Sequence, residues 1–225
     1  MSKEYFDAIR AGETGKVNAM IVADPGLLSA KDENGMGAFV VAKYSRRNDV
    51  AALLLEKGVE LDIFAACMAG AEERVVELIS HHPDLTKSYS SDGWTPLHLA
   101  GFFNQPALIE ALLTYGAEVN ARARNQMANA PIHAAAAGRS RDSVRILLEH
   151  GADANARQAA GFTPLHSAAQ GGDAEMARLL IASGADVQAR ADNNQNAMDL
   201  AMTGGHQAVV DVLDEYASST GTAAG

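Results

Sequence analysis

The chain has 225 residues, of which 48% are hydrophobic and 20% are charged, a balance typical of a folded globular protein. Its formal net charge of −10 argues against binding to nucleic acid or to an anionic membrane, since both need a basic surface. The single cysteine, Cys67, cannot form an internal disulfide and lies in an apolar segment, so we expect a buried thiol in a reducing compartment.

The N-terminal residues do not resemble a targeting segment. Residues 1–7 contain acidic and basic side chains and lack the apolar run and cleavage site of a secretory signal. No part of the chain approaches the roughly 18 uninterrupted apolar residues that cross a bilayer. We therefore expect a cytoplasmic protein that does not associate with membranes.

Seven short helices are predicted by one recurring pattern, an apolar residue followed three positions later by alanine. The units that carry this pattern begin near residues 3, 37, 61, 95, 130, 163 and 196. The apolar residues are Tyr5, Phe39, Ile63, Leu97, Ile132, Leu165 and Met198. The alanines are Ala8, Ala42, Ala66, Ala100, Ala135, Ala168 and Ala201. Because the two positions share one helical face, each helix presents an apolar side with room for a close neighbour.

A second amphipathic helix is predicted in every unit, with apolar residues spaced as in Val144, Leu147 and Leu148. The turn between the two helices carries a glycine in four units, at Gly12, Gly70, Gly172 and Gly205. Arg46, Asn104 and Arg139 take its place elsewhere. Arginine tolerates a left-handed backbone poorly, so we expect those two turns to differ locally or to be strained.

The fourth unit contains the sequence Thr95-Pro96-Leu97-His98-Leu99-Ala100, which returns at residues 130–135 and 163–168 and, in altered form, at 196–201. These starting points are spaced 35, 33 and 33 residues apart. Threonine can cap a helix through its side-chain oxygen, and proline is favourable at the first helical position. A period of about 33 residues with Thr-Pro-Leu-His-x-Ala resembles the ankyrin-repeat family.

This resemblance implies an all-α solenoid of about seven stacked helix-turn-helix units joined by β-hairpin-like fingers, with fingers and first helices lining a concave face. We assign residues 1–216 to this domain and residues 217–225 to a flexible C-terminal tail. The unit at residue 37 is followed after only 24 residues by the next, so one finger is missing before Leu61. The finger between Gly116 and Ala130 is two residues longer than its neighbours and should protrude or bulge.

The sequence gives no support to an enzyme. His98, His133 and His166 stand at one phase of successive units, so we interpret them as structural residues whose ring nitrogens connect neighbouring repeats. His81 and His82 have no third ligand nearby, and zinc sites need three or four. Phosphate loops, nucleophile elbows and dinucleotide fingerprints are absent. We expect no catalytic residues, no metal and no cofactor.

Large apolar side chains occupy phases that should be exposed on the concave face. Tyr44, Met68 and Phe102 share one phase of three consecutive units and should form a surface stripe. The predicted partner-binding residues are Met36, Tyr44, Met68, Trp94, Phe102, Phe103, Met127, Asn129 and Phe162. Exposed apolar patches of this kind mark interaction sites. The alternative is that Trp94 or Phe103 folds over the missing finger as additional core.

We therefore expect a non-enzymatic scaffold, monomeric, that binds an unidentified protein partner on its concave face. Self-assembly through the same aromatic stripe is the alternative function. Two groups of arginines either bind an acidic partner or are ordinary surface charge. One group is Arg139, Arg141 and Arg145, and the other is Arg122 and Arg124.

Overall fold

The protein is described by a computed structural model that covers residues 2–221. It confirms an all-α architecture, with seven helix pairs and no β-strand within that range. The pairs are α1 (Ser2–Ala11) and α2 (Thr14–Ala23), α3 (Ala38–Tyr44) and α4 (Asn48–Glu56), α5 (Ile63–Ala69) and α6 (Glu72–His81), α7 (Pro96–Phe102) and α8 (Pro106–Thr114), α9 (Pro131–Ala137) and α10 (Arg141–Glu149), α11 (Pro164–Gly171) and α12 (Ala174–Ala182), and α13 (Ala197–Thr203) and α14 (Gln207–Gly221). Single 3₁₀ turns occupy Pro25–Ser29, Pro83–Lys87 and Ala159–Gly161.

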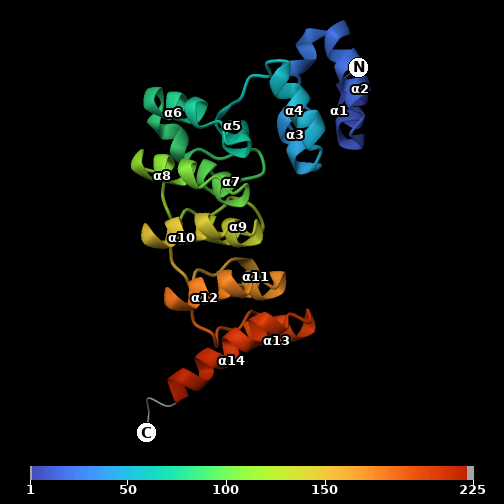
Figure 1. Cartoon of the computed structure of the whole chain (residues 1–225). Coiled ribbons are helices and arrows are strands. Elements are labelled where there is room, and N and C mark those ends of the chain that lie inside the picture. Colours follow the sequence, from blue (N-terminus) through green and yellow to red (C-terminus); the bar gives the residue numbers. More distant parts are fainter. Residues whose placement is uncertain (1, 222–225) are drawn as a thin grey trace.

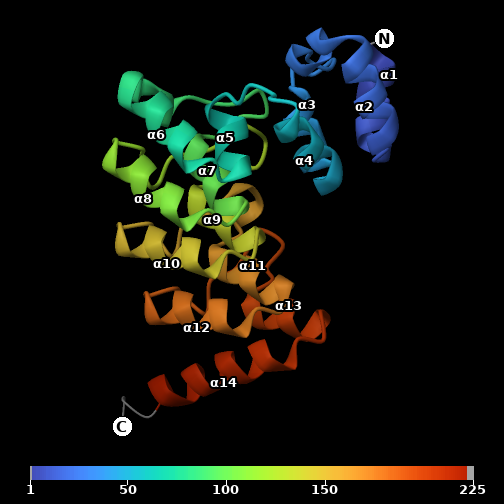
Figure 2. The ribbon, with the colours of Figure 1, turned by 45° about the horizontal axis from the view of Figure 1, so that its top comes forward.

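The first helices of the later pairs lie in one layer and the second helices in another. Figures 1 and 2 show α5, α7, α9 and α11 on one side of the stack, with α6, α8, α10 and α12 on the other. Each first helix packs on the first helix of the next pair through its apolar face, and the alanine at the shared phase is buried in every pair. A methyl group at this phase lets the helices approach closely.

The helix starts follow from side-chain capping. Thr95 accepts a hydrogen bond from the backbone N–H of His98, and Pro96 opens α7 at the position where an N–H is not needed. In the third pair the capping residue lies one position later in the repeat than Thr95 does in the fourth pair. Asp62 caps α5 by accepting from Ala65 N at 2.8 Å. Its first helix therefore begins at Ile63, without a proline.

All the turns between paired helices share one left-handed geometry, including those without glycine. Arg46, Asn104 and Arg139 have φ values of 55°, 54° and 56°. Of the two expectations for the arginine turns, a different local shape is therefore excluded and strain is the one that applies. Their strain is retained instead, because the repeat fixes the path of the chain between the two helices of each pair.

The motif histidines connect consecutive repeats, as predicted. His98 Nδ1 accepts from Thr95 N at 3.3 Å, which leaves the proton on Nε2 for donation to Asn129 O at 2.9 Å in the next finger. His133 donates in the same way to Phe162 O at 3.2 Å, and His166 donates to Gln195 O at 3.1 Å. Both ring nitrogens of each histidine are thus used, which removes them from any metal site.

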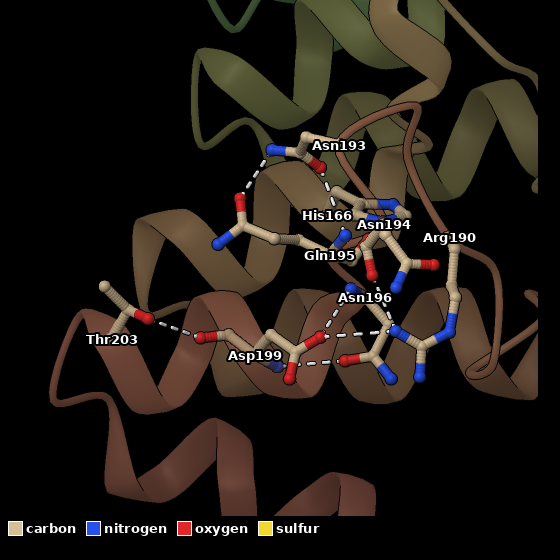
Figure 3. A network of polar contacts seen from close by, with 8 residues as sticks. All are labelled: His166, Arg190, Asn193, Asn194, Gln195, Asn196, Asp199 and Thr203. Carbon is tan, nitrogen blue, oxygen red and sulfur yellow. Dashed lines mark hydrogen bonds and ion pairs between the residues drawn. The ribbon is translucent and has the colours of Figure 1, made fainter.

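Asp199 replaces histidine at this phase in the last pair, as Figure 3 shows. Its carboxylate accepts from Asn196 N at 3.0 Å, while its own N–H donates to the Asn196 side chain at 2.9 Å. Arg190 lies 3.6 Å from the same carboxylate. Asn196 and Asp199 thus form a capping box at the start of α13.

The fingers are hairpin-like, and successive fingers are joined through their backbones. Arg124 N donates to Gly93 O at 2.8 Å, Ala159 N to Met127 O at 2.7 Å, and Asp192 N to Ala160 O at 2.9 Å. Between α4 and α5 the chain runs directly from Lys57 to Asp62, so the finger predicted to be missing is indeed missing. The stack changes direction at this point, and Figures 1 and 2 show α4 lying apart from α6.

The C-terminal helix is longer than predicted. The tail was assigned from residue 217, but α14 continues to Gly221. Residues 222–225 of that tail lie outside the described residues. Val209, Val212 and Leu213 bury one face of α14, and the helix extends beyond this contact.

We expect Arg46→Gly to stabilise the protein. A left-handed backbone costs a side-chain-bearing residue about 1–2 kcal/mol, and the greater freedom of unfolded glycine offsets about 0.5–1 kcal/mol of that gain. The free energy of unfolding in urea should therefore rise by about 0.5–1 kcal/mol. Gly58→Ala is the reciprocal control, since Gly58 has φ 76° and open space around its Cβ position, and it should destabilise. Unchanged stability in both variants would show that these turns are unstrained.

We also expect stability to fall on mild acidification. Burial lowers the pKa of His98 and of His133 from 6.5 to about 4, so folding favours the neutral rings. Their contribution is complete above pH 6.5 and is lost as the pH falls toward 4, on the order of 2 kcal/mol per ring between pH 7 and pH 5. Urea titrations at both pH values measure this loss, and His98→Gln should reduce it. Equal free energies at pH 7 and pH 5 would contradict the assignment.

Candidate functional site

A surface pocket lies where the finger is missing, and we call it the notch. It has a volume of about 400 Å³. It is lined by residues 28–31 and 35–37 before α3, by residues 89–92 of the next finger, and by parts of α3, α5, α7 and the linker 59–62. The other consecutive pairs are each joined by a finger. The notch is therefore a direct consequence of the shortened repeat.

Two apolar residues in the notch stand at the phase that carries histidine later in the chain. Val40 on α3 and Phe64 on α5 line the pocket and are half-buried. A histidine at residue 40 would lack its usual acceptor, because no finger follows α3–α4. The same phase is also apolar at Phe6 and Phe64, although a finger follows each of those pairs. Val40 and Phe64 together give the notch apolar lining residues.

Four of the predicted residues come together beside the notch, and we call Tyr44, Trp94, Phe102 and Phe103 the aromatic cluster. Their ring centroids are separated by 6.4 Å for Tyr44–Phe103, 5.2 Å for Phe102–Phe103 and 5.4 Å for Trp94–Phe102. The last two pairs are edge-to-face, a favourable aromatic geometry. Trp94 and Phe103 also pack against the core, so the cluster is both an extension of the core and a surface.

Tyr44 connects the end of α3 to the finger before α7. Its hydroxyl donates to Asp92 Oδ2 at 2.6 Å across 48 residues of sequence. Burial, together with the Asp92 carboxylate, raises the pKa of Tyr44. The neighbouring Lys43 places its ammonium 5.0 Å from the Phe103 ring centroid, and burial lowers the pKa of Lys43. The change in stack direction thus brings the second pair against the fourth.

Two of the predicted site residues are buried, which corrects the expected continuous stripe. Met68 is 1% exposed, because α3 and α7 both pack on α5 and leave it at the bottom of the notch. Asn129 is 2% exposed and its backbone carbonyl accepts the His98 bond. The concave surface therefore has apolar side chains on both sides of Met68, but the methionine itself is covered.

The other predicted residues lie at separate places. Met36 is half-buried and lines the notch from its finger. Met127 is 49% exposed near the tip of the long finger. Phe162 is half-buried with its ring centroid 5.2 Å from that of His166. Among these, only Met36 belongs to the notch.

The arginine groups are engaged in local contacts. Arg141 binds Asp173 with an Nε–Oδ1 distance of 2.9 Å, and Arg145 binds Asp142 and Glu149 on its own helix. Arg124 stacks over the Tyr89 ring at 3.9 Å. These contacts favour the interpretation of ordinary surface charge over a subsite for an acidic partner.

The sequence reasoning missed Val40, Phe64 and the notch itself. The sequence contains two signals that could have located the notch. The repeat spacing shows that a finger is missing, and Val40 and Phe64 are apolar at the phase that carries histidine later in the chain. Within residues 2–221, no group of three or more His, Cys, Asp or Glu side chains is placed to hold a metal ion. None of the helices in that range combines the length and the apolar content needed to cross a bilayer.

The family is established by comparison with known proteins. The family model described as "Ankyrin repeats (3 copies)" matches residues 63–158 and 132–221, which together span more than half of the chain. The chain therefore belongs to the ankyrin-repeat family. The first two helix pairs lie outside the match, and they also lack the motif histidine.

One relative shows how far this similarity extends. The chain is 33% identical over 116 residues, half of its length, to the transient receptor potential cation channel subfamily A member 1 of Homo sapiens. The aligned segment is 10% of the channel. The similarity therefore supports the repeat fold and carries no ion-channel activity to this chain.

We expect Tyr44→Phe to loosen the first two helix pairs selectively. The variant loses one hydrogen bond to a carboxylate at a partly exposed site, worth about 1 kcal/mol. Amide exchange should accelerate in α1–α4 and remain unchanged in α9–α12. Tyr115→Phe is the matched control, because Tyr115 and Tyr44 are both 38% exposed and Tyr115 lies at the end of α8. Uniform exchange rates in all variants would contradict a connecting role for Tyr44.

Proposed function

We propose that this chain is a non-enzymatic protein-binding module whose partner binds at the notch and the adjacent aromatic cluster. The observation that carries the proposal is their juxtaposition, a pocket of about 400 Å³ with both apolar and charged lining residues beside four contacting aromatic rings. Buried aromatic anchors beside a pocket are typical of interaction hot spots. Ankyrin repeats are generally protein-interaction modules, which is consistent with this proposal.

The arrangement favours binding over chemistry. Each motif histidine uses both of its ring nitrogens within the fold, and Cys67 is buried, which raises the pKa of its thiol. Neither group is therefore positioned as a base or a nucleophile. A burial-protected thiol also suits the reducing cytoplasm, where we propose that the protein acts.

Phe102→Ala tests the proposed surface, because Phe102 is the half-buried ring between Trp94 and Phe103. Partners captured from the native host's lysate would be identified, and their affinities measured with purified proteins. We expect at least a tenfold loss of affinity, the effect of a hot-spot residue of about 1.4 kcal/mol or more. Tyr115→Ala removes an exposed aromatic at the end of α8 and should leave binding unchanged.

Two controls complete this test. Thermal unfolding must show that Phe102→Ala remains folded, and light scattering over a concentration series must show a monomer. A folded Phe102→Ala protein with full affinity would place the partner on another surface. Concentration-dependent dimers that Phe102→Ala disrupts would favour self-assembly through the cluster instead.

A further inference from the structure

The notch interrupts a backbone ladder that runs along the fingers. Each donor in this ladder directly follows the residue whose N–H closes its own finger. The closing bonds run from Ala123 N to Asn129 O, from Gln158 N to Phe162 O and from Ala191 N to Gln195 O. The donors to the preceding finger are Arg124, Ala159 and Asp192. In these three fingers, one backbone N–H is thus bonded to the finger before it.

The same rule identifies the donor at the notch. Ser90 N closes its finger on Trp94 O at 2.8 Å, so Ser91 N–H is the equivalent donor. Ser91 is exposed and lines the notch. Within residues 2–221 its N–H has no hydrogen-bond partner, because the finger that would accept it is missing. An extended backbone supplied from outside would find this donor available.

The side chains around this donor define what kind of segment fits. Met36, Val40 and Phe64 contribute apolar side chains to the lining of the notch. The charged residues that line the notch are Lys31, Glu60, Asp62 and Asp92, three acidic and one basic. Together with the chain's net charge of −10, this surface favours a segment that is positively charged.

We infer that the notch accepts an extended, basic segment of a partner protein, which takes the place of the missing finger. Its backbone carbonyl accepts from Ser91 N–H, an apolar side chain enters between Val40 and Phe64, and Lys or Arg side chains face Glu60 and Asp62. The inference rests on the proposed function and specifies the chemistry of the partner. Unlike the proposed function, the inference requires the Ser91 N–H and the carboxylates of Glu60 and Asp62 to take part in binding.

The probe is a display library of random linear nonapeptides, selected on the full chain, with one enriched sequence then synthesised for titration. Ser91→Pro and Ser91→Ala form the matched pair of variants. Ser91 is the second residue of a turn in which Gly93 N bonds to Ser90 O, and neither central residue has a positive φ. Proline is favoured at this position, so it removes the N–H while keeping the turn.

We expect the enriched peptides to be net basic with at least one large apolar residue. Ser91→Pro should weaken binding about three- to tenfold, the effect of one backbone hydrogen bond, whereas Ser91→Ala should change it less than twofold. Asp62→Asn removes a charge while keeping a capping side chain on α5, and it should weaken binding about twofold. Each variant is first shown to be folded by circular dichroism.

A further variant restores the finger within the chain. Replacing residues 59–61 with residues 152–162 gives the interval from Gly58 to Asp62 the length found between Gly151 and Thr163. This variant should no longer bind the peptide. Any one of four results would overturn the inference. These are enrichment of acidic peptides, no enrichment at all, equal effects of Ser91→Pro and Ser91→Ala on binding, and binding of the peptide by the restored-finger variant.

The result separates this inference from the proposed function. If Phe102→Ala abolishes capture of the cellular partner while the Ser91 pair has no differential effect, the binding surface stands and finger replacement fails. If Phe102→Ala has no effect either, both fail. A second copy of the chain as the occupant would appear as concentration-dependent dimers that the restored-finger variant does not form, and this outcome would also overturn the inference.

Discussion

Each helix pair in this chain has an apolar face that its own two helices cannot cover, and the stack exists because the next pair covers it. The buried alanine at one phase of every first helix allows the close approach. The histidines of the later repeats then connect one pair to the finger of the next, with both ring nitrogens hydrogen-bonded inside the fold. Local capping and long-range stacking thus use the same side chain.

At the notch, the finger to which such a histidine would donate is missing. Where no finger follows, the histidine phase carries Val40, and the stack turns. The turn brings the end of α3 to the finger before α7, where Tyr44 meets Asp92 and Lys43 lies over Phe103. A single shortened connection therefore accounts for the pocket and for the contact between the second and fourth pairs.

The repeat architecture could be predicted from the sequence because its signals are local. Thr95-Pro96 marks a helix start, and the alanine phase and the spacing locate the pairs and the shortened repeat. The histidine bonds followed from their position in successive repeats. The aromatic cluster could be predicted only in part. Trp94, Phe102 and Phe103 are close in sequence, but the approach of Tyr44 depends on the direction in which the stack turns.

The burial of Met68 could not be predicted for the same reason. Repeat phase placed it with Tyr44 and Phe102, whereas its exposure depends on how α3 and α7 close over α5. The length of α14 was underestimated because residues 217–221 are small and polar. For the Arg46 turn, residue preference predicted either a different shape or strain, and the turn is left-handed because the packing of two helices outweighs the cost of one left-handed arginine.

A surface built from similar repeats does not by itself fix where a ligand binds. A ligand that fits one repeat can shift by one repeat and make nearly the same contacts again. The missing finger breaks this translational symmetry at one point. A ligand that recognises the gap has a single origin along the array, and every further contact it makes is counted from there. A missing finger in a repeat protein can thus fix where along the stack a ligand binds. Additional side chains on a stack without a gap would do this less readily.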